Sequence, residues 1–470
     1  MHDERSENAT SDRLWDDGKF RGPDKPGTQK SRLQGSRHMQ RIAFFEDAAA
    51  DNFRPLIWLR PVFELRCGHY TVRERLLAAF PLAEWGASLR PYLAEAYAEE
   101  HPTAHVNSER WLAAGPTLLV NGRWLGDPKY LDSLTPREAV VSEGAVAAIW
   151  IDAEEAAVLS SVPDWTAAIA RLANARDAVT RPGRLLRYPW DLVDANPAQL
   201  TADFRSRRRG PTKADLNSQV AILGRDEDVF IDPSAQVDPF VVLDARTGPI
   251  WIDAESRLQP FTRLEGPCYV GQGSQLFRAN VREGTTIGPV CRVGGEVEES
   301  ILHGYVNKYH DGFLGHSYVC PWVNLGALST NSDLKNDYST VRVPLWGESI
   351  DSGSTKVGCF IGDHSKTAIC SLFNTGTSVG VMSMVLPSGE LLPKHIPGFS
   401  RYWHGEIETL PDVESAIETA RIAMSRRQFR LTPAAETLLR RVHEMTSTER
   451  ASTRSHADTR QGTGVTARVR

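Results

Sequence analysis

Residues 252–276 read IDAESRLQPFTRLEGPCYVGQGSQL, with an apolar side chain at every sixth position. A second segment, residues 361–385, keeps the same spacing with one threonine among its repeat positions. The repeat positions are Ile252, Leu258, Leu264, Val270 and Leu276, and then Ile361, Thr367, Phe373, Val379 and Val385. A fixed period of six is the sequence signature of a parallel β-helix, in which three short sides close one coil and the repeated residue points inward. The sequence therefore predicts a hexapeptide-repeat β-helix over residues 229–400.

Hexapeptide coils of this kind resemble the left-handed β-helix, an exception to the usual right-handed crossover. The period fails over residues 301–336, which carry three histidines, and residues 337–356 leave it as an insertion that we expect to be a hairpin or a loop. Functional side chains often lie on such excursions from a rigid scaffold. We therefore expect the chemistry of this half of the chain in residues 301–336.

Short apolar runs alternate with helical patterns between residues 39 and 204. The runs cover residues 42–47, 117–125 and 145–152, and the helical patterns cover residues 72–80, 89–100 and 165–175. This alternation predicts an α/β domain with a mostly parallel sheet. Ligands of such sheets bind outside the carboxyl ends of the strands, and this rule puts Glu46, Asp47 and Asn121 near any site.

Two further segments of this half carry unusual side chains. The segment LRPVFELRCGHYTVRER, residues 59–75, contains Arg60, Arg66 and Arg73. Guanidinium forks could bind phosphates here, and the alternative is a solvated helix face. In RYPWDLVDANPAQLTADF, residues 187–204, the pattern predicts a helix with Asn196 as N-cap and Pro197 as its first residue.

Together these segments resemble a family of sugar nucleotidyltransferases with a diverged N-terminal domain. The motifs are FED at 45–47, RPV-x-ELR-x-G-x-x-T-x-RE at 60–74, NGR at 121–123, and YPWD with an N-x-x-x-L helix at 188–200. The resemblance implies nucleotidyl transfer from a nucleoside triphosphate to a sugar 1-phosphate, with Mg²⁺ and release of pyrophosphate. The nucleotide-binding residues that it implies are Arg60, Arg66, Arg73, Asn121, Asp191 and Asn196. The sequence lacks the Gly-rich LxxGxGTR loop of ordinary sugar nucleotidyltransferases, and Asn121 stands where they carry a metal-binding Asp.

The segment GHSYVCPWVNLGALSTN, residues 315–331, resembles the acetyltransferase half of the bifunctional N-acetylglucosamine-1-phosphate uridyltransferases. The resemblance implies acetyl-CoA as co-substrate and His316 as the general base that deprotonates an amino sugar 1-phosphate. His310 competes for this role because Asp311 stands next to it. A histidine bonded to a neighbouring coil is the alternative for His316. The substrate-binding candidates are Lys308, Tyr318, Asn324, Asn331 and Lys335.

The ends of the chain and one internal segment lack a pattern that could build a core. We expect disordered tails at residues 1–38 and 447–470 and a basic linker at residues 205–228, whereas residues 401–446 should form helices that follow the solenoid. Met39 directly precedes the first apolar run and is an alternative start to Met1.

Composition limits the function classes. The formal charge is −5, which argues against nucleic acid as a partner, and no apolar run is long enough for a membrane span. No secretory signal is visible, and six scattered cysteines without a C-x-x-C pair fit a reducing cytoplasm. We expect a homotrimer formed along the solenoid. Two functions stay open: a nucleotidyltransferase coupled to an acetyltransferase, and a trimeric β-helix scaffold or sugar-phosphate sensor whose N-terminal domain binds nucleotide without turnover.

Overall fold

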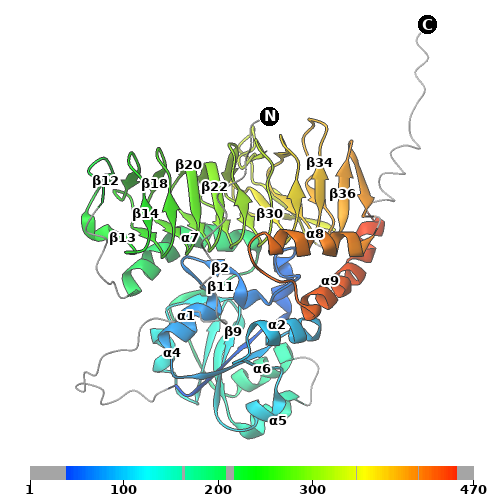
Figure 1. The fold of residues 1–470 in the computed structure, drawn as a ribbon. Coiled ribbons are helices and arrows are strands. Elements are labelled where there is room, and N and C mark those ends of the chain that lie inside the picture. Colours follow the sequence, from blue (N-terminus) through cyan, green and yellow to red (C-terminus); the bar gives the residue numbers. More distant parts are fainter. Residues whose placement is uncertain (1–38, 161–164, 208–215, 346, 411, 453–470) are drawn as a thin grey trace, which may run out of the picture. The chain divides into compact units, whose positions relative to one another are not determined.

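The computed structural model describes residues 39–160, 165–207, 216–345, 347–410 and 412–452. Within these residues an N-terminal α/β domain is followed by a β-helix, and two C-terminal helices come last (Figure 1). The expectation of a disordered tail at residues 1–38 and the question of Met1 or Met39 concern residues outside the described part. In the described part, no helix combines the length and apolarity that a membrane crossing needs.

The α/β domain is built on a mixed sheet whose described strands follow the order β10-β8-β9-β6-β1-β4-β5. The bounds are β1 Arg41–Phe45, β4 Glu84–Ser88, β5 His105–Val106, β6 Thr117–Asn121, β8 Glu138–Ser142, β9 Ala145–Ile151 and β10 Asp177–Val179. The strands β1, β4, β5 and β6 run parallel, and β9 is antiparallel to both neighbours. The predicted α/β domain is therefore confirmed.

Helices and short strands complete this domain. The helices are α1 Val72–Ala79, α2 Ala94–Glu100, α3 Glu109–Leu112, α4 Lys129–Asp132, α5 Ala153–Ser160, α6 Trp165–Asn174 and α7 Pro189–Ser206, with the 3₁₀ turns η1 Ala48–Phe53, η2 Val62–Glu64 and η3 Pro91–Leu93. The short strands are β2 Arg66–Cys67, β3 Tyr70–Thr71, β7 Trp124–Gly126 and β11 Gly183–Leu185. The predicted run 117–125 is two strands, β6 and β7, because the chain turns at Gly122 and Arg123.

The start of α7 differs from the sequence prediction, which placed it at Asn196. The helix begins at Pro189, and the Asp191 carboxylate accepts hydrogen bonds from the backbone N–H groups of Arg187 and Tyr188. Pro197 lies inside the helix. The prediction was wrong because two prolines in one segment each satisfy the rule for a first helical residue, and the earlier proline has the capping carboxylate.

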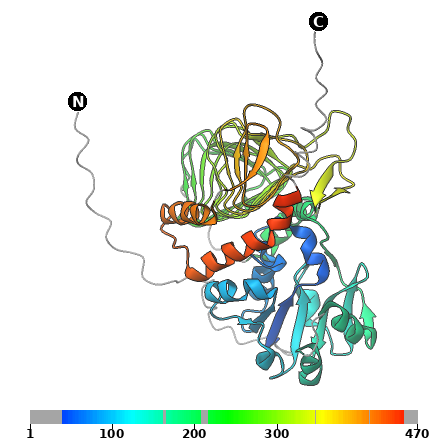
Figure 2. The same cartoon turned by 90° about the vertical axis from the view of Figure 1, so that its right-hand side faces the viewer.

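The β-helix is a stack of coils whose strands pair in parallel with the coils before and after (Figure 2). One face consists of β13 Val229–Ile231, β16 Ile250–Ile252, β19 Cys268–Val270, β21 Thr285–Ile287, β23 Ile301–Leu302, β26 Tyr318–Val319, β30 Cys359–Ile361, β33 Thr377–Val379 and β35 His395–Ile396. The other faces are formed by β12 Ala221–Leu223, β14 Gln236–Val237, β15 Val242–Asp244, β17 Arg257–Leu258, β18 Arg263–Glu265, β20 Gln275–Val281, β22 Arg292–Glu298, β24 Asn307–Lys308, β25 Phe313–Gly315, β27 Thr330–Asn331, β31 Lys366–Thr367, β32 Leu372–Phe373, β34 Met384–Leu386 and β36 Ser400–Trp403, with β37 Glu406–Thr409 added antiparallel. The predicted left-handed parallel β-helix is confirmed.

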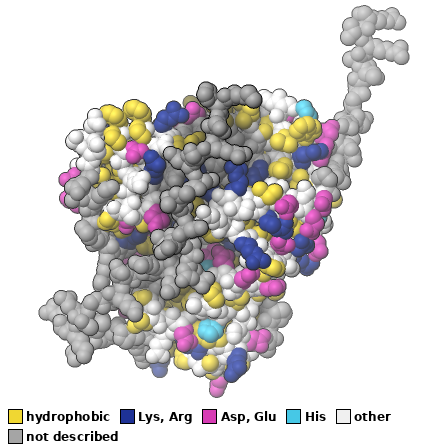
Figure 3. Space-filling model, in the orientation of Figure 1, with side chains coloured by type: hydrophobic (Ala, Val, Ile, Leu, Met, Phe, Trp, Pro, Cys, Tyr) yellow, Lys and Arg dark blue, Asp and Glu magenta, His cyan; other side chains and the backbone are white. Residues whose placement is uncertain are grey.

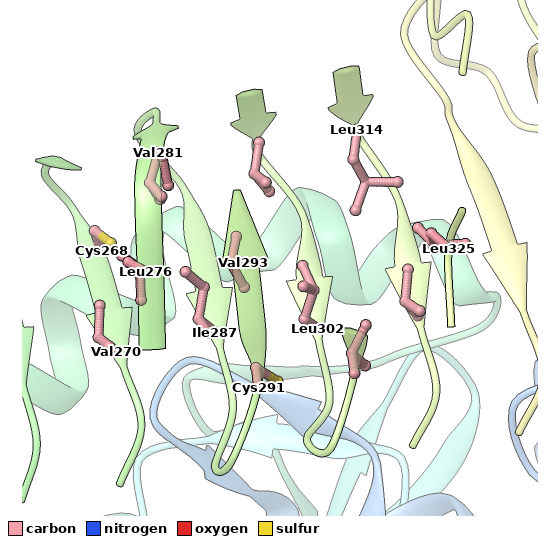
Figure 4. Packing of buried hydrophobic residues seen from close by; sticks show 14 of the residues in the cluster. Cys268, Val270, Leu276, Val281, Ile287, Cys291, Val293, Leu302, Leu314 and Leu325 are labelled. Carbon is pink, nitrogen blue, oxygen red and sulfur yellow. The ribbon is translucent and has the colours of Figure 1, made fainter. Parts of the chain in front are cut away.

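The repeat positions fill the interior of this β-helix. Leu276, Ile287, Val293 and Leu302 point into the stack from successive strands (Figure 4). The residues of both predicted hexad series are buried. The first strand of the stack, β12, pairs with β15, so the β-helix begins upstream of residue 229 and inside the segment expected as a linker. Part of that segment, residues 208–215, lies outside the described residues.

The insertion at residues 337–356 contains the antiparallel hairpin of β28 Arg342–Leu345 and β29 Glu348–Asp351, as predicted. Val341, Val343 and Leu345 are buried in one cluster with Leu56 and Ile57 of the α/β domain. The hairpin therefore fastens the β-helix to the segment that follows η1.

The C-terminal helices α8 Val413–Ser425 and α9 Pro433–Met445 connect the two halves of the chain. Between them, Arg427 donates to the carbonyl oxygen of Val290 at a β-helix corner, while Leu438 and Leu439 of α9 share a core cluster with the α/β domain. Figure 3 shows charged side chains of both signs mixed over this region, in agreement with the ion pairs of Arg421 and Arg440. Residues 447–452 continue as helix, so order extends past the expected start of the tail at residue 447.

A buried ion pair tests how the loop at residues 66–71 is held. The Arg75 guanidinium donates to Asp203 of α7, with Nη2–Oδ2 at 2.7 Å and Nε–Oδ1 at 3.0 Å. We expect Arg75→Met to lower the free energy of unfolding by about 3–5 kcal/mol, because Asp203 is left charged and buried. The double variant Arg75→Met/Asp203→Leu should cost less than the sum of its single variants. Urea unfolding measures both values, and Arg441→Met in an exposed pair is the control. Additive costs would contradict the pairing.

Candidate functional site

A cavity of about 560 Å³ lies at the carboxyl ends of β1, β4 and β5, where an α/β sheet binds its ligands. Its walls include the strand-end residues Glu46 and Ser88, Asn107 just after β5, Glu109 of α3 and Trp165 of α6. Of the three side chains that the sequence places near such a site, Glu46 and Asp47 line the cavity, and Asn121 contacts Asp47.

The carboxylates at this edge are bound by arginines. Glu46 accepts from Arg90 Nε at 3.0 Å, and Asp47 accepts from Arg123 Nε at 2.7 Å. The Asn121 carboxamide donates to Asp47 Oδ2 at 2.8 Å. The NGR turn after β6 therefore supplies the counter-ion of the acid at the end of β1.

This arrangement does not fit a magnesium ion held by the protein. A bound Mg²⁺ needs carboxylate oxygens with free lone pairs, whereas Glu46, Asp47 and Asp51 each face an arginine. The Asn121 carboxamide already forms hydrogen bonds with Asp47 and with backbone groups. Among the described residues, no group of three or more His, Cys, Asp or Glu side chains could hold a metal ion.

The predicted nucleotide-binding arginines lie away from this cavity and bind carboxylates. Arg60 forms an ion pair with Asp363 of the β-helix, Arg66 lies 3.4 Å from Glu74, and Arg73 Nε donates to Glu64. The side chains are largely buried, so they do not form a solvated helix face. The arginines connect the loop at residues 60–75 to its own helix and to the β-helix.

Asp191 and Asn196 also have internal partners. Asp191 caps α7, and Asn196 is fully buried. The Asn196 carboxamide accepts from the N–H of Gly68 at 2.6 Å and donates to the carbonyl oxygen of Gly284 at 2.7 Å. None of the six predicted nucleotide-binding residues lines the 560 Å³ cavity.

His316 lies in a buried cluster at a β-helix corner. Its Nδ1 is 2.8 Å from Asp333 Oδ2, and its Nε2 is 3.4 Å from Glu299 Oε2. Burial disfavours the charged imidazolium, but the bonds to Asp333 and Glu299 outweigh it and raise the pKa of His316 to about 9. At neutral pH this side chain keeps its proton, so as placed it is a poor general base.

The substrate-binding candidates around His316 make contacts within the protein. The Lys308 ammonium donates to the carbonyl oxygens of Gly294 and His310, and burial lowers the pKa of Lys308 to about 8. Tyr318 is fully buried, and its hydroxyl accepts from the backbone N–H of Arg66. The other contacts are Asn324 with Asn307, Asn331 with Gly315, and Lys335 with Ser339.

A second cavity, of about 380 Å³, contains His310 on another side of the β-helix. Asp311 and Arg278 line it with His310, and the rings of Phe277 and Tyr309 lie 4.1 Å apart in its wall. The buried Lys308 ammonium donates to the His310 carbonyl oxygen. The structure thus brings His310 and Asp311 to one cavity and leaves His316 outside it.

Sequence reasoning missed most of the residues that line the two cavities. Ser88 ends β4, and Arg90 and Asn107 lie just after β4 and β5, two strands whose apolar runs are too short to be recognised. Arg278 and Phe277 belong to β20, in which no repeat position marks them. The signal that could have identified the first group is a polar residue at or directly after the end of a parallel strand.

Comparisons with known proteins agree with the resemblance drawn from the sequence. Residues 42–211 match the model of a family described as sugar nucleotidyl transferase. Over 202 residues the chain is 30% identical to the bifunctional sugar-1-phosphate nucleotidylyltransferase/acetyltransferase of Sulfurisphaera tokodaii, covering 42% of this chain and 43% of that protein. The chain thus matches less than half of the length of this relative. The resemblance to these transferases is confirmed over the matched segments.

Solved acyltransferases give weaker matches. A UDP-N-acetylglucosamine acyltransferase is 15% identical with a TM-score of 0.21, covering 48% of this chain and 86% of that one. The corresponding Arabidopsis enzyme is 9% identical with a TM-score of 0.22, covering 45% and 79%. A TM-score this low does not establish a common fold.

The His316 cluster predicts a pH-dependent stability. Because the folded-state pKa of about 9 lies above the ordinary value of 6.5, the folded chain binds more protons between these values, and stability falls as pH rises through this window. We expect a loss of as much as about 3 kcal/mol between pH 6.5 and 9 that His316→Gln abolishes. Urea unfolding of both proteins at several pH values measures the difference. Parallel curves for the wild type and the variant would contradict the cluster.

Proposed function

We propose that this chain is a two-site transferase of nucleotide-sugar synthesis. Its β-helix transfers an acetyl group from acetyl-CoA to the amino group of an amino sugar 1-phosphate. Its α/β domain binds a sugar phosphate that is a substrate of the same synthesis. The observation that carries the proposal is the 380 Å³ cavity, in which a histidine, a neighbouring carboxylate and an arginine meet beside two aromatic rings.

His310 has the role of general base in this proposal. The ammonium of the amino sugar gives its proton to the His310 imidazole, and the free amine attacks the thioester carbonyl carbon. The carbon–sulfur bond breaks, the imidazolium gives its proton to the departing thiolate of CoA, and the nitrogen of the new amide loses its second proton to water. Arg278 offers a guanidinium for a phosphate group, and the Phe277–Tyr309 pair offers a stacking surface for a base or a sugar ring.

Two candidate functions exist for the α/β domain. Nucleotidyl transfer from a nucleoside triphosphate to a sugar 1-phosphate is supported by the family match over residues 42–211 and by the printed name of the relative. Binding without turnover is supported by the arginines on Glu46, Asp47 and Asp51, which take the oxygen atoms that a magnesium ion would need. Release of pyrophosphate from a nucleoside triphosphate by the purified chain separates the two.

The acyl-transfer proposal predicts the effect of removing His310. His310→Ala should lower kcat/KM for acetyl transfer to glucosamine 1-phosphate by about 10²–10⁴-fold, since a positioned base contributes this much. Detection of the freed CoA thiol measures the rate, and His404→Ala, on an exposed turn after β36, should keep full activity. The His310 assignment fails if His310→Ala is fully active while a folded His316→Ala is inactive. A wild-type chain without any acetyl transfer would favour the scaffold function.

The proposed homotrimer has a candidate interface along one β-helix corner. Phe240, Phe261 and Leu328 occupy equivalent positions of their coils with positive φ, and 48%, 70% and 55% of their surfaces are exposed. Water-exposed apolar side chains in a strained backbone conformation fit a surface that a partner covers.

Charge at this corner should disrupt the trimer. We expect Phe261→Asp/Leu328→Asp to sediment as a monomer at micromolar concentration, because an assembled interface would bury the new carboxylates. Leu82→Asp, at an exposed site of the α/β domain, should sediment like the wild type. Sedimentation equilibrium gives the masses, and a monomeric wild type would end this part of the proposal.

A further inference from the structure

We infer that the cavity of the α/β domain holds the sugar portion of its ligand by direct contact with side chains, without a metal ion and without the triphosphate of a nucleotide. This inference rests on the proposed function for the presence of a sugar ligand. It goes beyond that function by assigning the chemical group that enters the cavity.

The first argument is that the three acids that follow β1, Glu46, Asp47 and Asp51, are already paired with arginines. Asp47 and Arg123 are both buried, so a metal ion could take Asp47 only by leaving a buried guanidinium without its partner. Glu46 is equally enclosed, and Arg90 binds both of its oxygen atoms. The Arg54 guanidinium lies 2.9 Å from Asp51, which completes the set.

The second argument is that Arg90 is the single arginine among the described lining residues, that these residues include no lysine, and that Arg90 is already bound within the protein. The donors of Arg90 are committed to Glu46, to the Tyr92 hydroxyl and to the carbonyl oxygens of Ile57 and Arg60. Phosphate sites of α/β sheets use unpaired backbone N–H groups. Here the N–H of Leu89 donates to Asn107 Oδ1 at 2.9 Å.

The start of η1, directly after β1, is closed in the same way. The N–H of Ala48 donates to Thr166 Oγ1, and the N–H of Ala50 donates to the carbonyl oxygen of Asp47. This chain carries the short alanine-rich turn AAADNF here. Its bonded N–H groups cannot also hold phosphate oxygens.

The third argument concerns the lining groups that remain open. Neither the Ser88 hydroxyl nor the Glu109 carboxylate has a side-chain hydrogen bond or ion pair within the described residues, and both line the cavity. A hydroxyl and a carboxylate bind sugar hydroxyls or a sugar amine. The partly buried ring of Trp165 lies in the same wall and offers an apolar surface to the face of a pyranose.

Saturation-transfer NMR of the full chain with UDP-N-acetylglucosamine tests the inference, because this probe carries a sugar, a diphosphate and a base. We expect saturation on the sugar-ring protons that exceeds that on the uracil protons and does not change when EDTA replaces Mg²⁺. Ser88→Phe, which fills the cavity, should abolish the sugar signal. Ser133→Phe, at an exposed site of the same domain, should leave it intact.

Glu109→Gln is a second test variant for the case that Ser88→Phe does not fold. Glu109 is exposed, so we expect this change to leave the structure intact. We expect this variant to weaken binding several-fold. The inference is overturned if the sugar signal needs Mg²⁺, if the uracil protons carry it, if the probe does not bind, or if Glu109→Gln and a folded Ser88→Phe leave it unchanged.

Transfer assays on the same preparation separate the inference from the proposed function. Metal-independent sugar binding without acetyl transfer would leave the inference standing and remove the function. Acetyl transfer without sugar binding at this cavity would support the proposed acetyltransferase function and overturn the inference. Pyrophosphate release that Ser88→Phe abolishes would place triphosphate chemistry in the cavity and overturn the inference directly.

Discussion

The Tyr318 hydroxyl accepts a hydrogen bond of 2.8 Å from the backbone N–H of Arg66, and this buried contact joins the two halves of the chain. Tyr318 stands on the β-helix face that also presents Trp251 and Tyr269 to the α/β domain. Because this face is covered by the chain's own N-terminal half, a substrate cannot reach Tyr318. The cavities that remain open lie elsewhere, at His310 and at the carboxyl edge of the α/β sheet.

Much of the fold follows from local patterns in the sequence. The six-residue period predicts the inward side chains of residues 252–276 and 361–385, because the period is a direct consequence of coil geometry. The hairpin at residues 342–351 follows from the break in that period. The start of α7 did not follow, since two prolines satisfied the same local rule.

Much less of the candidate sites was predictable, for a physical reason. A guanidinium has the same appearance in sequence whether it binds a phosphate or a buried carboxylate. Arg60 finds Asp363 more than 300 residues away along the chain, and His316 finds Asp333 and Glu299 on neighbouring coils. Such partners are fixed by the tertiary packing, so a motif can name a residue type without naming its contact. The family resemblance predicted His316 as a general base, whereas in the folded chain its imidazole contacts two carboxylates.

The corners of the β-helix show how one local geometry can have different uses. At one corner, Tyr305, Trp322 and His364 have positive φ, and Phe429 from the segment between α8 and α9 packs on the first two rings. At the corner with Phe261 and Leu328, the same backbone conformation presents apolar side chains to water. Both rows have the same backbone conformation, but among the described residues a segment of the chain packs on the first row and the side chains of the second row stay exposed.

The NGR turn after β6 shows how charge balance can be kept at a sheet edge without a metal ion. An acid at the end of a buried strand needs a counter-ion, and in this chain Arg123 provides it from within the same turn that carries Asn121. A guanidinium is a permanent partner, because it stays charged at every physiological pH and cannot dissociate from the chain. A metal ion would instead tie the charge state of the pocket to ligand binding. By fixing the charge in the sequence, the domain keeps its pocket formed in the absence of any ligand, and the chemistry left to the pocket is that of its uncommitted hydroxyl and carboxylate groups.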